Sequence, residues 1–241
     1  DFLPIDPQVT LGEGWTPLAD AARWDATFKL EYVFPSGSFK DRGATATLSW
    51  AADLGVEHVV EDSSGNAGAA IAQYAARAGI DAEIYVPAAA KDSKLKAIRR
   101  VGATPVPVEG TRQDVTDACV GAVEDGDAWY ASHGWNPAFF AGTATFAFEL
   151  AAQRDWSVPD AVVLPVGHGT LFLGAYRGFS ALEAAGWTDA VPRLLGVQAT
   201  GVAPIADALH GTAAASTTDA ADGIQIADPA TADQVPDALA D

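Results

Sequence analysis

Two patterns of apolar residues follow one another along the chain: alternation with polar residues, and recurrence at every third or fourth position. The first is typical of strands and the second of helices, because side chains repeat every two residues in strands and about every 3.6 in helices. The helical pattern of residues 39–54 gathers four apolar side chains on one side: Phe39, Leu48, Ala51 and Leu54. Gly55 is expected to end this helix. The repeated switch indicates βαβ units around a mainly parallel sheet.

The same patterns predict elements over most of the chain. Helices are predicted at residues 39–54, 67–78, 89–101, 112–124, 140–153 and 171–185. Strands are predicted at residues 56–60, 82–86, 104–108, 161–166 and 194–199. His210 is expected to end a further helix. The last thirty residues are rich in Ala, Asp and Thr. Residues 210–223 are expected to form a loop, and the remainder to be weakly structured or cut short.

The composition is that of a globular protein. With 241 residues, 49% of them apolar, the chain has room for one large α/β domain or two small ones. Its apolar runs are too short to span a bilayer, and the start DFLPIDPQ lacks the features of a signal peptide. Cys119 is the only cysteine, so a disulfide framework within the chain is excluded and a cytoplasmic location is expected.

Charge excludes several classes of partner. The 32 Asp and Glu residues against 14 Lys and Arg residues give a net charge of −18, which argues against binding to nucleic acids or anionic membranes. Few Lys, many Asp and abundant Ala resemble proteins of salt-loving archaea, so a halophilic source is a hypothesis. The four His residues show no ligand spacing such as H-E-x-x-H, and no metal site is predicted.

The stretch PSGSFKDR, residues 35–42, is the first that could carry chemistry. Its Pro and Gly favour a sharp turn into a helix capped by Ser36 or Ser38, with Lys40 in the first helical turn. The positive end of the helix dipole would lower the pKa of Lys40 and favour the neutral amine that a covalent lysine needs. A solvated lysine paired with Asp41 is the alternative.

Two further loops lie between a predicted strand and a predicted helix. In SSGNAGAA, residues 63–70, two hydroxyls, a glycine and an asparagine could bind a small anion such as a carboxylate, or could simply cap the helix. In PVGHGTL, residues 165–171, the two glycines let the backbone approach a ligand, and the helix start offers a phosphate site. An ordinary tight turn is the alternative for this second loop.

The spacing in the second of these loops excludes two nucleotide-binding motifs. A P-loop requires Gly-Lys-Ser/Thr, which is absent. A dinucleotide fingerprint requires G-x-G-x-x-G, whereas the next glycine after Gly169 is Gly174, and the following strand ends in Gln198 and Ala199 without an acid for a ribose. A phosphate without a dinucleotide is the better interpretation.

Four motifs together resemble a known family: GEGWTPL (12–18), PSGSFKDRG (35–43), SSGN (63–66) and VGHGTL (166–171). Their order and spacing resemble the pyridoxal-phosphate enzymes of the tryptophan synthase β-like fold (fold type II), most of all threonine synthase and its close paralogues. The likeness runs from about residue 11 to 230. It implies two three-layer α/β/α domains with a cleft between them: a large cofactor-binding domain of residues 1–45 and 145–241, and a small domain of residues 46–144.

The resemblance also implies roles for single residues. Lys40 would form a Schiff base with pyridoxal 5'-phosphate, and Phe39 would pack on the pyridine ring. Asn66 would hydrogen-bond the 3-hydroxyl of the cofactor. The substrate carboxylate would be bound by Ser63 and Ser64, with Ser36, at the position of the family's Thr, as a further contact. The cofactor phosphate would be bound by the segment of Gly167, His168, Gly169, Thr170 and Leu171.

The activity that the resemblance implies is the conversion of O-phospho-L-homoserine and water to L-threonine and phosphate by a homodimer. Lys40 would act as general base and acid. Asp41 and Arg42 favour threonine synthase over dehydratases, whereas Phe34 and His168 stand where many relatives have Asn. No residue matches the Ser or Thr that the family places at the pyridine nitrogen. The alternatives are a serine or threonine dehydratase, a diaminopropionate ammonia-lyase, a cysteate synthase-like enzyme, or a non-catalytic protein that binds an amino acid or small anion.

Overall fold

The computed structural model describes residues 3–126, 128–211 and 220–240. Contacts between Cα atoms divide the chain into two compact units, a first unit of residues 3–142 and a second unit that comprises residues 143–241. Residues 3–45 thus belong to the first unit by this criterion, whereas the sequence interpretation grouped residues 1–45 with 145–241. The division into a large and a small domain stays a prediction.

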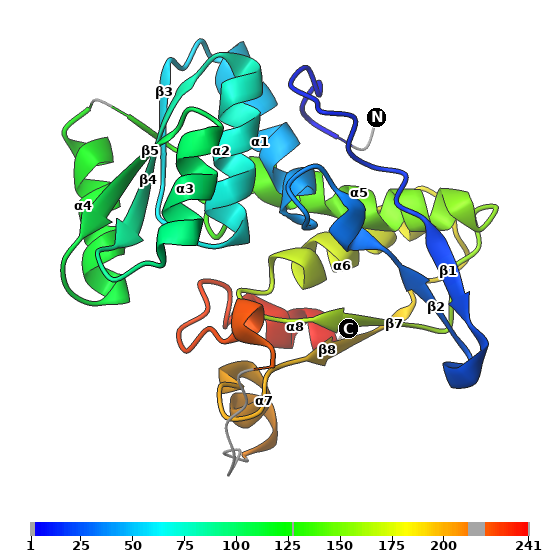
Figure 1. The fold of residues 1–241 in the computed structure, drawn as a ribbon. Coiled ribbons are helices and arrows are strands. Elements are labelled where there is room, and N and C mark those ends of the chain that lie inside the picture. Colours follow the sequence, from blue (N-terminus) through cyan, green and yellow to red (C-terminus); the bar gives the residue numbers. More distant parts are fainter. Residues whose placement is uncertain (1–2, 127, 212–219, 241) are drawn as a thin grey trace. The chain divides into compact units, whose positions relative to one another are not determined.

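A four-stranded parallel sheet forms the centre of the first unit (Figure 1). Its strands lie in the order β5 (Thr104–Val108), β4 (Asp81–Pro87), β3 (His58–Glu61) and β6 (Trp129–Tyr130). Val59 pairs with Ala82 in the register between β3 and β4. Four helices accompany this sheet: α1 (Lys40–Asp53), α2 (Asn66–Ala78), α3 (Asp92–Arg100) and α4 (Arg112–Glu124). Parallel strands alternating with helices confirm the predicted α/β class.

The two faces of this sheet have separate apolar cores. Buried residues of α1, α2 and α3 share one core with Val59 and Ile84, whereas Val115 and Cys119 of α4 share the other with Val60. Neighbouring residues of β3 thus point to opposite faces, as the two-residue period of a strand requires. Glu61 continues the side of Val59, and the following Asp62 continues the side of Val60.

Local signals explain where several helices begin and end. Thr111 and Asp114 form a reciprocal capping box at the start of α4. Gly79 follows α2 in the left-handed conformation, with φ 71°, which is available to glycine without steric cost. Gly55 follows α1 with a φ of 71° as well, so the predicted stop at this residue is confirmed. Leu54 does not belong to the buried side of α1 as predicted, since it is 56% exposed.

The sequence interpretation missed an antiparallel hairpin near the N-terminus. It consists of β1 (Leu18–Ala21) and β2 (Ala26–Lys29), and short 3-10 helices occupy Ala22–Trp24 and Glu31–Val33. The rings of Trp24 and Phe28 meet edge to face with centroids 5.8 Å apart, and both side chains are exposed. Strands of four residues without a buried alternating face leave little apolar pattern to detect.

The second unit contains a parallel pair of strands, β7 (Ala161–Pro165) and β8 (Arg193–Val197), joined through α6 (Thr170–Ala184). Helix α5 (Pro137–Gln153) runs across the division between the units. The remaining elements are α7 (Pro204–His210), a 3-10 helix (Asp222–Ile224) and α8 (Gln234–Ala240). His210 ends α7 as predicted. The prediction that the residues after 223 are weakly structured is wrong, because α8 is helical and buries Val235.

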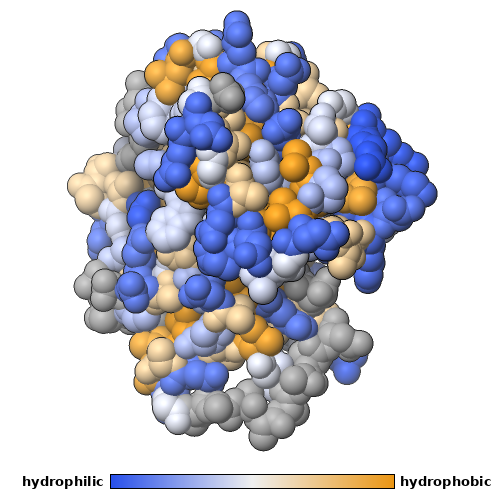
Figure 2. Space-filling model, turned by 90° about the vertical axis from the view of Figure 1, so that its left-hand side faces the viewer, coloured by the Kyte–Doolittle hydropathy of each residue, from blue (hydrophilic) through white to orange (hydrophobic). Residues whose placement is uncertain are grey.

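The other predicted helices and strands are present, with ends that differ by up to three residues. Part of the loop expected at residues 210–223, residues 212–219, lies outside the described residues. Among the helices of the described ranges, none is both long and apolar enough to cross a membrane. Hydrophilic residues occupy much of the face in Figure 2, with apolar residues in small groups between them, as the acidic composition leads one to expect.

Candidate functional site

Lys40 is the first residue of α1 and is partly buried. Its Nζ lies 4.6 Å from the ring centroid of Phe39 and 5.8 Å from that of Phe139. Burial lowers the pKa of Lys40 to about 8, and the charge of Glu61 acts in the opposite direction. The sequence predicted a lowered pKa from the helix dipole, whereas desolvation of the ammonium group is the main cause here. The lowered pKa increases the fraction of neutral amine near neutral pH, and the neutral amine is the form that attacks a carbonyl group.

The turn before Lys40 is fixed by its own polar groups. Gly37 has a φ of 85°, and its N–H donates to the carbonyl of Phe34 over 2.8 Å. The hydroxyl of Ser38 accepts a hydrogen bond from the backbone N–H of Lys40 at 3.3 Å. Ser36, a predicted substrate contact, donates from its backbone and its hydroxyl to Asp41. Asp41, the alternative partner for Lys40, thus holds the turn in place.

Phe34 is a packed residue of this turn. It is 5% exposed, and the guanidinium carbon of Arg42 lies 4.9 Å from its ring centroid. Arg42 in turn forms a bidentate ion pair with Glu31, with nitrogen to oxygen distances of 2.7 and 2.8 Å. Phe34 and Arg42 therefore brace the segment that leads into α1.

The loop SSGN connects β3 to α2. Gly65 is the N-cap of α2 and Asn66 its first residue, and no side chain caps the helix. Instead, the hydroxyl of Ser63 accepts from the N–H of Gly65 at 3.3 Å. Within the described part of the chain, the side chains of Ser64 and Asn66 make no hydrogen bond. The helix-capping alternative is therefore not realised, and these polar groups remain available for a ligand.

A glycine inside α2 lets this loop close. A Cβ atom on Gly68 would lie 1.8 Å from the carbonyl oxygen of Ser63 and 2.9 Å from a methyl carbon of Ile84. The backbone of the loop therefore rests directly on the first turn of the helix. Any larger residue at position 68 would displace Ser63, a predicted substrate contact.

The sequence interpretation missed two ionisable residues, Glu61 and His133, that interact electrostatically with Lys40. Glu61, at the end of β3, is fully buried, and its Oε1 is 2.6 Å from Nδ1 of His133. Burial raises the pKa of Glu61 well above its usual value, and lowers that of His133 to about 3 with a further contribution from the charge of Lys40. The only sequence signal was an acid at the end of a buried strand, two positions before SSGN.

Asp62, the next residue, points to the other side of the sheet. Its carboxylate accepts from Arg112 at 2.6 Å, from Thr116 at 2.8 Å and from Tyr130 at 2.9 Å. Burial alone would raise the pKa of Asp62, but the charge of Arg112 and these hydrogen bonds lower it below the ordinary value. Adjacent carboxyl groups at the end of β3 thus have opposite pKa shifts.

The loop GHGT belongs to the second unit and leads from β7 into α6. Gly169 is the N-cap of α6, with a φ of 83°. The hydroxyl of Thr231 donates to the carbonyl of His168, and Nδ1 of His168 accepts from the N–H of Ala230 at 3.2 Å. The His168 side chain therefore orders the loop, a role that the sequence did not predict. Thr170 is buried, and its carbonyl accepts from the hydroxyl of Thr143 at 3.1 Å.

The predicted site residues therefore fall into two groups, one in each unit. Lys40 and Phe39 are in contact in the first unit, which also contains Ser36 and the SSGN loop. Gly167 to Leu171 lie in the second unit.

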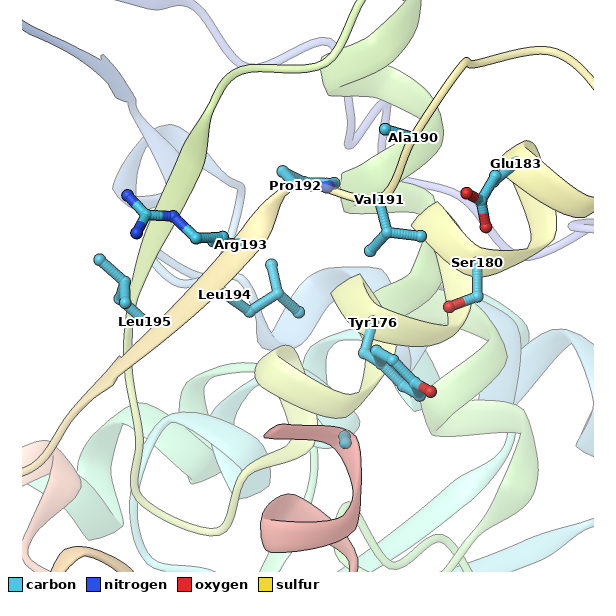
Figure 3. Close-up of a pocket in the computed structure, with 10 residues that line it drawn as sticks. Tyr176, Ser180, Glu183, Ala190, Val191, Pro192, Arg193, Leu194 and Leu195 are labelled. Atoms are coloured by element: carbon cyan, nitrogen blue, oxygen red, sulfur yellow. The ribbon is translucent and has the colours of Figure 1, made fainter. Parts of the chain in front are cut away.

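A cavity of about 650 Å³ in the second unit is lined by residues of α6 and the start of β8 (Figure 3). Tyr176, Glu183 and Arg193 are among its lining residues, which include none of the predicted site residues.

Comparisons with known proteins converge on one family. Residues 9–241 match the model of the family described as "Pyridoxal-phosphate dependent enzyme". The chain belongs to this family. Threonine synthase of Methanosarcina acetivorans is 35% identical over 225 residues, which cover 90% of this chain and 55% of that protein. Threonine synthase of Methanocaldococcus jannaschii is 33% identical over 221 residues, covering 87% of this chain and 54% of that protein.

Solved structures of the pyridoxal-phosphate family share the fold. Maize serine racemase matches with a TM-score of 0.75 and 25% identity, over 88% of this chain and 65% of that chain. Threonine deaminase isoform 2 from Solanum lycopersicum matches with a TM-score of 0.73 and 25% identity, over 88% of this chain and 59% of that chain. These neighbours confirm the fold type II class. The chain spans about half the length of the curated relatives it matches.

The described residues fit such a cofactor. Lys40 offers a primary amine whose pKa is lowered toward neutrality, with the Phe39 ring beside it. In the second unit, Gly167 to Gly169 lead into the first turn of a helix of 15 residues, and the amide groups of a first turn attract anions such as phosphate. Within the described residues, no group of three or more His, Cys, Asp or Glu side chains could hold a metal ion.

Proposed function

We propose that this protein is a pyridoxal-phosphate-dependent lyase of the threonine synthase type. The observation that carries the proposal is Lys40, an amine with a pKa near 8 in the first turn of α1, in a chain of this family. Bound at this lysine, the cofactor would supply an electron sink for reactions at the α and β carbons of an amino acid. Lys40 would bind the cofactor aldehyde and then move protons at these carbons.

The other predicted residues would bind and orient. Phe39 would pack on the pyridine ring, and Asn66 would donate to the ring hydroxyl. Ser63 and Ser64, with the amide groups of their loop, would bind the substrate carboxylate, and Ser36 would contribute next to them. The available side chains of Ser64 and Asn66 support these assignments. The segment Gly167–Leu171 would bind the phosphate at the start of α6.

The reaction proposed is the conversion of O-phospho-L-homoserine and water to L-threonine and phosphate. The relatives named threonine synthase support it, at 35% and 33% identity. A dehydratase is the second candidate, because solved structures of similar fold include a threonine deaminase and because Phe34 replaces the Asn of the family motif. Burial of Phe34 against Arg42 is compatible with either, since the ring belongs to the packing of the turn.

Reconstitution tests the cofactor assignment. Purified protein with added pyridoxal phosphate is expected to show a visible absorbance band that borohydride bleaches, with the mass of the reduced cofactor fixed on the peptide that contains Lys40. Lys40→Arg keeps the positive charge but cannot bond to the aldehyde, so the band should be lost. Lys91→Ala, at an exposed lysine, should keep it. Wild-type protein without the band would refute the proposal and favour a non-catalytic binding protein.

Product analysis then separates the reactions. The reconstituted protein is incubated with O-phospho-L-homoserine, L-serine and L-threonine, in dilute buffer and in molar KCl because of the acidic composition. Threonine and phosphate from the first substrate would support threonine synthase. An α-keto acid from serine or threonine would indicate a dehydratase instead. The homodimer is also a proposal, which light scattering of the same preparation tests.

A further inference from the structure

One buried hydroxyl group joins three segments of the first unit. Tyr74 lies on α2, and its side chain is 0% exposed. Its hydroxyl donates to Oε2 of Glu13 over 2.8 Å and lies 3.4 Å from Oδ2 of Asp41. Glu13 belongs to the motif GEGWTPL, and Asp41 belongs to the motif that contains Lys40. Because a phenol has a single hydrogen, the two carboxylates share one donor.

Glu13 is held in place by its own loop. The same Oε2 accepts from the N–H of Leu11 at 2.8 Å and from the hydroxyl of Thr10 at 3.1 Å. Burial alone would raise the pKa of Glu13, but the hydrogen bonds from Leu11 and Tyr74 lower it. Burial raises the pKa of Tyr74, and the charge of Asp41 adds to this effect. Near neutral pH, Glu13 is therefore an ionised acceptor and Tyr74 a protonated donor.

Asp41 connects this hydroxyl with the turn before Lys40. It is 0% exposed and follows Lys40 directly in the first turn of α1. Its Oδ2, which faces Tyr74, also accepts from the N–H of Ser36 at 2.9 Å, and its Oδ1 accepts from the Ser36 hydroxyl. A displacement of this carboxylate would therefore move both the turn and the start of α1, and with them the backbone of Lys40.

The ring of Tyr74 belongs to the packing between α1 and α2. These two helices lie against each other (Figure 1). The ring is part of the apolar core that Ala44 of α1 shares with Ala70 of α2. Helix α2 begins at Asn66, the last residue of the SSGN loop. Tyr74 therefore stands in the same helix as that loop while its hydroxyl reaches the start of α1.

We propose that Tyr74 is a positioning residue for Lys40. Its hydroxyl, oriented by Glu13, holds the Asp41 carboxylate and thereby keeps the first turn of α1 in a fixed position relative to the SSGN loop. The motif GEGWTPL supplies the carboxylate that orients the hydroxyl. The proposal rests on the proposed function, because this position matters for a cofactor that Lys40 and Asn66 would contact together.

The first test observes Lys40 by nuclear magnetic resonance in protein without added cofactor. Its Nζ lies 4.6 Å from the ring centroid of Phe39 and 5.8 Å from that of Phe139, so the rings should shift the signal of a carbon-13-labelled Cε. The chain has five lysines, and Lys40→Arg identifies the signal of Lys40. Tyr74→Phe removes the hydroxyl but keeps the ring. The Lys40 signal is expected to move toward those of the other lysines, because Lys40 is then held less firmly beside the two rings.

Tyr85→Phe is the matched control. It also removes a hydroxyl from a buried tyrosine of the first unit, one that lies 3.4 Å from a carboxylate oxygen of Glu83. Tyr85 belongs to the core on the opposite side of the sheet, so the Lys40 signal should stay in place. Denaturant titration measures the stability of both variants. A loss of stability in Tyr74→Phe with an unchanged Lys40 signal would show a purely structural role and overturn the proposal, as would an equal change of the signal in Tyr85→Phe.

The second test measures the affinity for pyridoxal phosphate through the visible absorbance band. The dissociation constant of Tyr74→Phe is expected to rise about tenfold, as the loss of one hydrogen bond would cause, and that of Tyr85→Phe to stay within about twofold of wild type. Equal affinities of Tyr74→Phe and wild type would contradict the positioning role. Wild-type protein without the band would refute the proposed function, whereas the Lys40 signal of the cofactor-free protein would still decide the role of Tyr74.

Glu13→Ala is the second variant should Tyr74→Phe fail to fold, and circular dichroism establishes that each variant is folded. It removes the nearer acceptor of the hydroxyl, so the Lys40 signal should move in the same direction by a smaller amount. Where both single variants fold, the double variant should give the signal of Tyr74→Phe alone, because Glu13 acts through the hydroxyl. An unchanged signal in Glu13→Ala, or additive shifts in the double variant, would overturn the proposal.

Discussion

Residues 62–65 connect β3 to α2, and residues 166–169 connect β7 to α6. Both loops lead from the carboxyl end of a parallel strand into a helix, where ligands gather in α/β proteins. The first loop is anchored by charge, because Asp62 accepts hydrogen bonds from three side chains that include Arg112. The second loop has no Asp, Glu, Lys or Arg, and Thr231 and Ala230 bind its His168.

The two loops also differ in how far along the chain the residues that contact them lie. The first loop rests in part on its own βα unit, since Gly68 of the following helix contacts the carbonyl of Ser63. Its other anchor, Asp62, binds side chains that lie 50 to 68 positions further along the chain. The second loop depends on a segment more than sixty residues further along the chain, which starts near Ala230. Ionisable groups surround the first loop and suit proton transfer, whereas glycine backbone dominates the second and suits an anion. The following substitutions test this contrast in order of expected effect.

Gly68→Ala should have the largest effect. The new Cβ would lie 1.8 Å from the backbone oxygen of Ser63, which cannot move without shifting the whole loop. We expect the free energy of unfolding to fall by about 3 kcal/mol or more, as measured by denaturant titration. Gly121→Ala in α4 is the matched control. Its Cβ meets nothing within 4 Å, so helix propensity should stabilise the protein by about 0.5–1 kcal/mol. Equal effects at both positions would contradict the close contact.

Asp62→Ala should come next, with a loss of about 2–3 kcal/mol. The substitution leaves the hydroxyls of Tyr130 and Thr116 and the guanidinium of Arg112 without their shared acceptor. Asp117→Ala is the control, because Asp117 is exposed on α4 and accepts only from Gln113 in the described structure. A loss no greater than that of the control would show that charge does not anchor the first loop.

The pH dependence of this loss has a definite sign. The pKa of Asp62 is lower in the folded protein than in the unfolded chain, where it is about 3.9. The stabilisation by its carboxylate is therefore fully present above that value and lost as the pH falls through the folded pKa. The difference between wild type and Asp62→Ala should thus shrink as the pH falls from that value through the folded pKa. A difference that grows in this acidic range would contradict the assigned ion pair.

The sequence located both loops but could not show how they are held. Apolar periodicity is a local signal, and it placed most helices and strands of both units. Glycine, serine and asparagine at strand-to-helix junctions marked the loops for the same reason. Contacts between Glu61 and His133 join residues 72 positions apart, and those between Asp62 and Arg112 join residues 50 positions apart. Such pairs follow from the strand order, which the pattern of single residues does not specify.

Weak local patterns account for the elements that were missed. The hairpin of β1 and β2 exposes many of its side chains, and β6 has only two residues, so neither shows alternation. Helix α8 was missed because its segment is rich in Ala and Asp, and its burial of Val235 depends on contact with the rest of the second unit. The role of His168 escaped for the same reason, since its partner lies in the segment just before α8.

Gly169→Ala should have a smaller effect than the two changes in the first loop. Alanine costs about 1–2 kcal/mol in the left-handed conformation, which Gly169 adopts with a φ of 83°. The new Cβ would meet the hydroxyl of Thr231 at 2.6 Å and a methyl carbon of Val235 at 2.7 Å, both side-chain ends that can rotate. We therefore expect a loss of about 2 kcal/mol in denaturant titration. Gly186→Ala, with a φ of 72° and no such neighbours, isolates the backbone contribution.

His168→Asn should have the smallest effect, and it tests whether the side chain at position 168 holds the second loop. The Asn side chain has an amide oxygen that can accept from the N–H of Ala230, as Nδ1 of His168 does at 3.2 Å. The change in unfolding free energy should stay within about 0.5 kcal/mol, whereas His168→Leu, which cannot accept, should cost about 1 kcal/mol. If both variants were equally stable, the hydrogen bond from the hydroxyl of Thr231 to the carbonyl of residue 168 would suffice to hold the second loop. The order of this loop would then depend on contacts to its main chain, and the side chain at position 168 would be free to vary.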